Sequence, residues 1–209
     1  MNREHQTTTS GRRVGIFVDV ANIFYASLDA EREIDYPALL AHTTKGRELV
    51  RAYAYTGLDP ENEAQKKFHR FLGESGYRVV AKEVRRFKDG AMKANLDIEL
   101  VVDLMRLAPR LDVAVIVAGD GDYAPAIRAI MEMGVRVEVI CFRRNTSKDL
   151  LDVADSFEEI SEIATVKGRS NRNSAPKKET SATNPARRET LSRRRTAGRA
   201  APARRRPRG

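Results

Sequence analysis

Residues 113–118 form a continuous apolar run of valine, alanine and isoleucine that ends abruptly in Gly119 and the carboxylates Asp120 and Asp122. A run of this length and composition is typical of a strand that is buried on both faces of a parallel sheet. In open α/β sheets, ligands bind beyond the carboxyl ends of the strands. The run therefore favours a parallel α/β fold in which the carboxyl end of this strand is exposed to solvent. The two acids that follow it, Asp120 and Asp122, indicate a functional site there.

A second apolar run, residues 14–18, is followed in the same way by Asp19, and Asn22 comes three residues later in the expected first turn of a helix. If the two strands are neighbours in a parallel sheet, their carboxylates converge on one point. A plain structural interpretation also exists for each residue, as a turn residue or a helix cap, with Asp122 capping a helix that begins at Tyr123. The joint occurrence of these residues is what favours a site.

Short apolar runs alternate with helical patterns from the first strand to about residue 160. This alternation predicts an α/β fold of three layers, α/β/α, around a mostly parallel central sheet. Gly76 and Gly134 stand where helix C-terminal caps are expected. The expected strands are 14–18, 49–55, 77–81, 113–118, 135–142 and 157–160, and the expected helices are 21–30, 36–43, 60–75, 96–107, 123–133 and 147–154.

The segment 96–107 is apolar on nearly every side of its helical pattern, which predicts a helix largely buried between other elements. Asp97 in its first turn is either a carboxylate favoured by the helix dipole or a member of the site. Asp103 lies on the same face as Leu96, and a buried acid there needs a partner or a metal. It either holds a neighbouring loop by a hydrogen bond or takes part in the chemistry.

Several carboxylates in one crevice repel one another and have raised pKa values unless a cation neutralises them. Oxygen ligands without histidine or cysteine select Mg²⁺ or Mn²⁺, and these ions activate water for phosphodiester hydrolysis. No phosphate-binding loop motif occurs, so no nucleotide cofactor is expected. The three histidines, His5, His42 and His69, lack metal-ligand spacing.

The segment between residues 82 and 93 is basic, with Phe87 in its middle. It is either a nucleic-acid contact, with Phe87 stacking on a base, or a solvated connection with Phe87 in the core. Arg85 and Arg86 are candidates for substrate contacts. Lys93, four residues before Asp97, is the candidate we single out for a phosphate contact.

The net charge of +9 is unevenly distributed over the 209 residues. Residues 167–209 hold 15 of the 38 Lys and Arg and 2 of the 29 Asp and Glu, a net charge of +13, whereas residues 1–166 carry −4. Such a tail predicts disorder and attraction to a polyanion, most simply a nucleic acid, and the alternative is that it binds ribosomes or DNA with the domain as a passenger. A single cysteine, Cys141, and the lack of any long apolar window lead us to expect a cytoplasmic protein with no membrane association.

These motifs together resemble the NYN domain, the LabA-like branch of the PIN-like nuclease superfamily. Two small departures are Ala21 and Ala118, where glycine and serine are common. The matching segments are residues 17–22, Lys93 with Asp97 and Asp103, residues 118–123, and finally Ser147, Leu150, Ala154, Asp155 and Phe157.

The resemblance implies a PIN-like fold over residues 12–166, between a disordered N-terminus at 1–11 and the tail at 167–209. It further implies a Mg²⁺- or Mn²⁺-dependent ribonuclease acting on single-stranded or structured RNA. The alternative is a non-catalytic RNA-binding module or a regulatory protein-interaction module, and a homo-oligomer is compatible with either. In the ribonuclease that the resemblance implies, the catalytic residues that bind the metal would be Asp19, Asp97, Asp120 and Asp122. Asn22 would hold Asp19 or a substrate phosphate by hydrogen bonds, and Asp103 would support the site from the helix.

Overall fold

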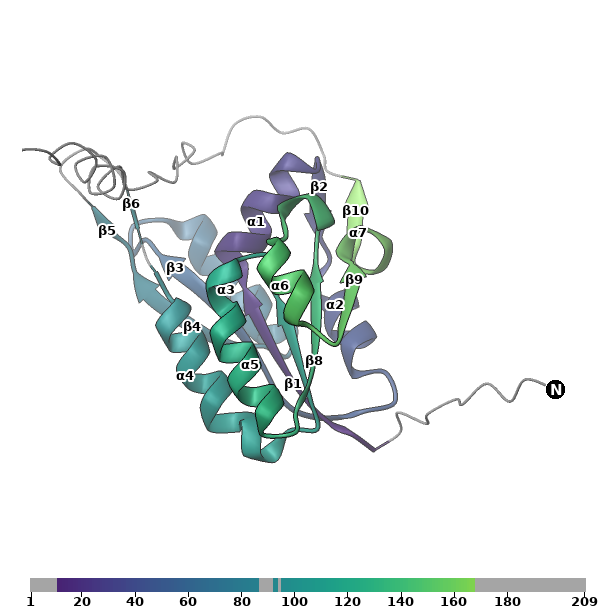
Figure 1. The fold of residues 1–209 in the computed structure, drawn as a ribbon. Helices are drawn as coiled ribbons and strands as arrows, with labels where there is room; N and C mark the ends of the chain where they lie inside the picture. Colours follow the sequence, from purple (N-terminus) through teal and green to yellow (C-terminus); the bar gives the residue numbers. More distant parts are fainter. Residues whose placement is uncertain (1–10, 87–91, 94, 168–209) are drawn as a thin grey trace, which may run out of the picture. The chain divides into compact units, whose positions relative to one another are not determined.

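The computed structural model describes residues 11–86, 92–93 and 95–167 (Figure 1). Its centre is a six-stranded sheet in the order β4-β3-β1-β7-β8-β9, and every neighbouring pair is parallel. The α/β prediction is therefore confirmed. The strands are β1 (Arg13–Asp19), β3 (Glu48–Leu58), β4 (Arg78–Glu83), β7 (Val113–Val117), β8 (Arg136–Cys141) and β9 (Ser156–Glu159).

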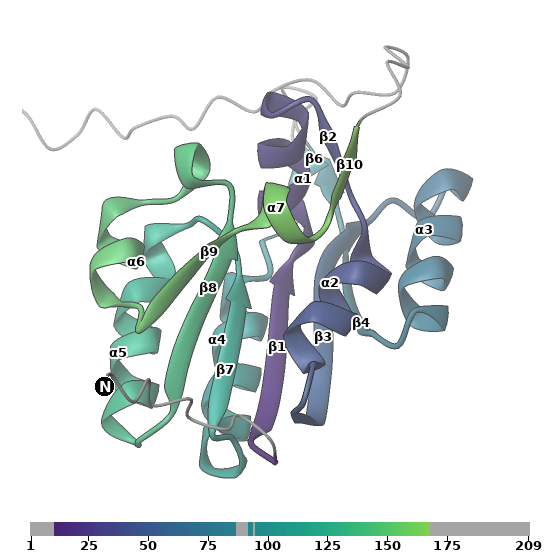
Figure 2. The ribbon, with the colours of Figure 1, turned by 90° about the vertical axis from the view of Figure 1, so that its right-hand side faces the viewer.

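Helices cover both faces of the sheet, so the strands are buried on two sides and read as continuous apolar runs (Figure 2). One core contains side chains of α1 (Val20–Asp29), α2 (Tyr36–Thr44), α3 (Glu63–Glu74) and α7 (Ile160–Ile163). The other contains side chains of α4 (Asp97–Leu107), α5 (Ala124–Glu132) and α6 (Lys148–Val153).

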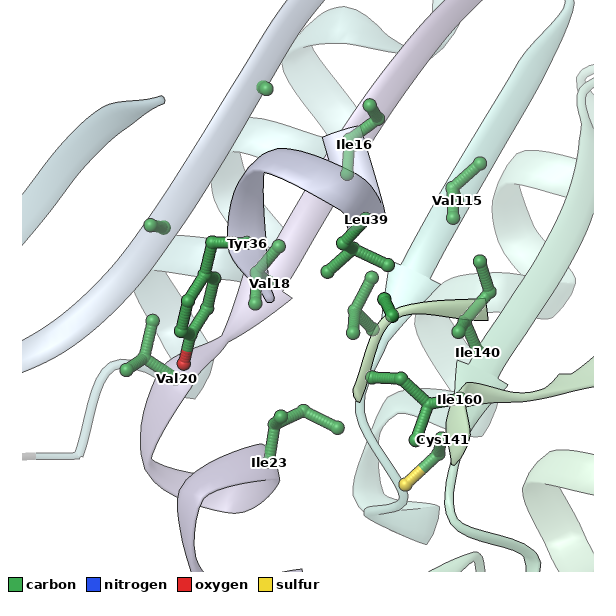
Figure 3. Close-up of a cluster of buried hydrophobic side chains, with 14 of the residues drawn as sticks. Ile16, Val18, Val20, Ile23, Tyr36, Leu39, Val115, Ile140, Cys141 and Ile160 are labelled. Carbon is green, nitrogen blue, oxygen red and sulfur yellow. The ribbon is translucent and has the colours of Figure 1, made fainter. Parts of the chain in front are cut away.

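Alternating residues of β1 supply the two cores. Ile16 and Val18 belong to the first core, near Leu39 of α2 and Ile160 of α7, as Figure 3 shows. Phe17 points the other way, into the second core. This period of two fixes which face of the strand each side chain occupies.

The structure corrects the expectation that the helix at 96–107 is largely buried. In α4 only Leu100 and Leu104 are buried, whereas Ile98 is 74% exposed and Val102 is 46% exposed. The reason is that α4 packs on the sheet along one side alone. An apolar composition does not reveal how many neighbours a helix has.

Several boundaries and short elements also differ from the predictions. The helix cap is Asp120, whose side chain accepts from the Asp122 N–H at the start of η2 (Gly121–Tyr123), so Asp122 is not a cap. The short antiparallel pair of β2 (Arg32–Ile34) and β10 (Thr165–Lys167) was not expected, because three residues give too little pattern. The last strand ends at Glu159 and not at Ile160 as predicted, because Ile160 begins α7, a short helix that the sequence analysis did not predict.

Within the described ranges, no helix is both long enough and apolar enough to cross a membrane. The predictions for residues 1–10 and 168–209, and for Phe87, lie outside the described residues.

Candidate functional site

The site residues lie where the strand order reverses. From β1 the chain continues to β3 and β4 on one side, and from β7 it continues to β8 and β9 on the other. Such a switch point opens a crevice at the carboxyl ends of the two central strands. Asp19 is the last residue of β1, and Asp120 follows β7 by three residues, so both are at this crevice.

Two of the predicted acids share one tyrosine. The buried Tyr123 Oη lies 2.8 Å from Asp19 Oδ2 and 2.9 Å from Asp97 Oδ1. A hydroxyl has one proton and donates to one carboxylate at a time. The second close contact is therefore favourable only when the other carboxyl is protonated or a cation lies nearby.

Burial raises the pKa of Asp19, and the neighbouring carboxylates Asp97 and Asp120 raise it further. The Asn22 N–H and the Tyr123 hydroxyl act in the opposite direction by donating hydrogen bonds to Asp19. Burial, together with Asp19 and Asp97, also raises the pKa of Tyr123 far above its ordinary value. Tyr123 is thus a neutral hydrogen-bond donor between two acids at physiological pH.

Local sequence explains why Asp19 sits at this point. It is the N-cap of α1, with Oδ1 accepting from Asn22 N at 3.0 Å. The Asn22 side chain in turn accepts from the Gly119 N–H at 2.8 Å. The first turn of α1 is therefore tied to the loop that carries Asp120.

Asp97 is held by a residue that sequence reasoning missed, Asn95. Asn95 Nδ2 donates to Asp97 Oδ2 at 2.8 Å, and Asp97 N donates to Asn95 Oδ1 at 2.9 Å. Lys82 Nζ donates to Asn95 O at 3.3 Å and to Glu99 Oε1 at 2.7 Å, which lowers the pKa of Glu99. Asn95 could have been found from its position two residues before Asp97, because an Asn side chain often accepts a hydrogen bond from the backbone N–H two residues later. Tyr123 had no comparable local signal.

The two remaining predicted acids are placed differently. The Asp122 side chain is exposed, and its backbone N–H donates to Asp120 Oδ1 at 3.0 Å. Asp103 Oδ2 accepts from Tyr55 Oη at 3.2 Å and its other oxygen lies 3.7 Å from Arg106. Asp103 thus links α4 to β3, about 9 Å along the helix from Asp97.

The basic segment forms a short antiparallel pair, β5 (Arg85–Arg86) with β6 (Met92–Lys93). Arg85 pairs with Lys93 in the backbone register, so the three predicted substrate contacts belong to one hairpin next to the start of α4. The prediction for their side chains stays a prediction.

The donor set fits a hard divalent cation in its chemistry. Asp19 and Asp97 offer oxygen ligands at one hydroxyl, and Asp120 acts on Asp19 electrostatically. Among the described residues, no group of three or more His, Cys, Asp and Glu side chains is already assembled as a metal site. Mg²⁺ does not need such a group, because it is usually bound by one or two carboxylates together with water and substrate phosphates.

Comparison with known proteins covers the same region. The NYN domain family model matches residues 13–161. The Low amplitude and bright protein LabA of Synechococcus elongatus is 32% identical over 164 residues, which cover 72% of this chain and 85% of that protein. A solved structure of a protein of unknown function from Vibrio parahaemolyticus has a TM-score of 0.68 and 30% identity, covering 76% of this chain and 99% of its own. The matched region contains Asp19, Asp97 and Asp120.

Proposed function

The chain belongs to the NYN domain family, and from this membership together with the site we propose that it is a metal-dependent ribonuclease. NYN domains are generally ribonuclease-type hydrolases. The observation that supports the proposal most is the pair of carboxylates, Asp19 and Asp97, that share the Tyr123 hydroxyl at the switch point between β1 and β7. Two partly buried acids in contact with one hydroxyl are unfavourable without a cation.

In the proposed mechanism, Asp19, Asp97 and Asp120 would hold Mg²⁺ or Mn²⁺, and the exposed Asp122 would be a fourth ligand. A cation bound there would polarise the scissile phosphate and lower the pKa of the attacking water. The protein's own side chains do the positioning. Tyr123 keeps Asp19 and Asp97 together without adding charge, and Asn22 fixes the loop of Asp120 against α1.

RNA is the proposed substrate, hydrolysed by water without a covalent enzyme intermediate. We assign phosphate contacts to Arg85, Arg86 and Lys93 of the hairpin, which adjoins α4 in the sequence. The basic residues of 168–209 would add an attraction that falls steeply with salt. They carry no catalytic groups.

The test is cleavage of end-labelled RNA by the full chain in Mn²⁺, Mg²⁺ or EDTA. We expect cutting with either metal, none in EDTA, and a loss of about 10²- to 10⁴-fold for Asp120→Asn, of the size expected when a metal-binding carboxylate is removed. Asp152→Asn, an exposed acid in α6, is the matched control and should cut like the wild type. A folded wild type that cuts none of several RNAs would contradict the proposal and favour the non-catalytic module.

Tyr123→Phe separates positioning from metal binding. The variant loses the hydroxyl that both acids contact but keeps the buried ring, so the fold should persist. We expect the metal concentration for half-maximal cleavage to rise about 10- to 100-fold. Saturating metal should restore most of the rate. A Tyr123→Phe enzyme with an unchanged metal titration would show that the hydroxyl has no part in the site.

A further inference from the structure

Helix α1 has an exposed apolar face that its role in the site does not explain. Phe24 is 39% exposed, Tyr25 is 37% exposed and Leu28 is 46% exposed. The two rings form an edge-to-face pair with centroids 5.6 Å apart. Aromatic rings at a surface next to a functional site indicate recognition of a partner. We call Phe24, Tyr25 and Leu28 the α1 aromatic face.

Two contacts place Tyr25, at one edge of this face, beside the site, whereas Phe24 lies at the far edge, about 160° around the helix from Asn22. Asn22, Tyr25 and Asp29 are three and four residues apart, so they share one side of the helix. The Asn22 side chain accepts from Gly119 N at 2.8 Å, and Asp29 Oδ2 accepts from Asn145 Nδ2 at 3.3 Å. Tyr25 lies between these contacts, on the side of α1 that adjoins the loops after β7 and β8.

The face is also close to the acids along the chain. Helix α1 begins directly after Asp19, and Tyr25 is about 9 Å further along the helix axis. Figure 2 shows α1 at the end of the sheet toward which the β1 arrow points. A strand of nucleic acid with one phosphate at Asp19 would therefore pass α1 within about one or two nucleotides.

Exposed cations lie near the same loops. Arg144 in η3 (Arg143–Asn145) and Lys148 at the start of α6 are both exposed. Rings flanked by cations match a polyanion that carries flat bases.

We propose that the α1 aromatic face is a nucleobase-binding subsite that stacks the unpaired bases of single-stranded RNA next to the bond being cut. This inference rests on the proposed function and adds to it a selection for unpaired substrate. Bases inside a duplex are stacked on each other and cannot reach the rings. Stacking tolerates every base, so the subsite would select for strand state and not for sequence.

The test measures RNA binding without cleavage, by fluorescence anisotropy of the full chain in EDTA. The probes are a single-stranded RNA oligomer and the same oligomer with abasic riboses, at raised salt so that the basic residues of 168–209 contribute less. The double variant Phe24→Leu with Tyr25→Leu removes both rings and keeps apolar surface. Phe24→Tyr with Tyr25→Phe keeps both rings, and Phe71→Leu removes an exposed ring of α3 as the matched control.

We expect the leucine variant to bind the RNA oligomer about 10- to 100-fold more weakly than the wild type. Its affinity for the abasic oligomer should be that of the wild type, and the ring-keeping variant and Phe71→Leu should bind both probes normally. Melting curves check that each variant is folded, and Tyr25→Leu alone replaces the double variant if that fails to fold.

Other outcomes would overturn the subsite. The first is that the leucine variant binds the RNA oligomer as tightly as the wild type, and the second is that it loses as much affinity for the abasic oligomer as for the RNA oligomer. The third is that sedimentation shows a dimer for the wild type and a monomer for the leucine variant, so that the lost affinity comes from the lost dimer. Failure of the proposed function gives a different result. Ring-dependent binding by a chain that never cuts RNA would leave the subsite in place and refute the nuclease, whereas a wild type that binds no RNA would refute both.

Discussion

Asp19→Asn is expected to remove RNA cleavage while raising the melting temperature of the metal-free protein. Loss of a metal-binding carboxylate removes several kcal/mol of transition-state stabilisation, about 10²- to 10⁴-fold in rate. The same carboxylate destabilises the fold without a cation, because Asp19 is desolvated and faces Asp97 and Asp120. Asparagine keeps one oxygen that accepts from the Asn22 N–H, and its NH₂ group can donate to the Tyr123 Oη, whose proton is then given to Asp97. The replacement removes the charge.

The stability difference should depend on pH in a defined direction. The folded-state pKa of Asp19 is raised, so the folded chain holds this proton more tightly than the unfolded chain. The stability of the wild type therefore falls as pH rises from the unfolded pKa through the higher folded one, and stays low above it. We expect Asp19→Asn to be more stable than the wild type at pH 7 in EDTA, with a Tm higher by about 2–4 °C for each kcal/mol gained in the free energy of unfolding. This difference in Tm should vanish near pH 4, where the wild-type carboxyl group becomes protonated in the unfolded chain as well as in the folded one.

The measurement is a series of melting curves from pH 4 to 8 in EDTA and again in Mn²⁺. Added Mn²⁺ should stabilise the wild type and leave Asp19→Asn unchanged, because only the wild type keeps the full ligand set. Asp152→Asn serves as the control for removal of an exposed charge. An Asp19→Asn chain that melts below the wild type at pH 7 in EDTA would contradict the proposal that the Asp19 carboxylate destabilises the metal-free fold.

Gly119→Ala is expected to damage both the fold and the site. A Cβ at this position would overlap the backbone carbonyl oxygen of Asn145, and it would lie 3.1 Å from Cys141 Sγ. The backbone cannot move aside easily, because Gly119 N donates to Asn22 and Gly119 O accepts from Ser147 N at 2.8 Å. We expect a loss of about 3 kcal/mol or more in the free energy of unfolding, at the upper end of overpacking effects.

Denaturant unfolding of the variant measures this loss, and cleavage in Mn²⁺ measures its effect on the site. Gly73→Ala in α3 is the matched control, since a Cβ there meets nothing within 4 Å and alanine favours the helix by about 1 kcal/mol. The two glycine replacements should thus have opposite signs. A Gly119→Ala chain as stable and active as the wild type would show that the loops after β7 and β8 can separate freely.

Much of the architecture could be predicted from local patterns. Strands buried on both faces have apolar runs such as 113–117, and Gly76 and Gly134 end helices with φ values of 99° and 88°, which glycine adopts without strain. The short β2 and β10 strands could not be predicted, because their pairing depends on segments about 130 residues apart in the chain. Burial of α4 was overestimated, since its periodicity carries no information about neighbours.

The candidate site was predicted in part. Asp19 and Asp120 were identified because each follows a strand, and parallel strands bring their ends to one edge. Tyr123 was missed because its importance is a contact with Asp19 and Asp97, 104 and 26 residues away. Whether Asp103 serves the site or the fold was left open, and its bond to Tyr55 places it between α4 and β3.

The sequence by itself determined which residues follow which element: an acid after the first strand, an acid pair after the strand at 113–117, and an acid at the start of α4. These are local consequences of strand and helix periodicity, which fix the face and the end of an element where a side chain lies. Only the tertiary structure decided which of these acids meet. The order of strands puts β1 beside β7, and Tyr123 lies between Asp19 and Asp97. The local patterns allow other contacts for these side chains. Packing selects this one, and packing depends on many distant residues at once.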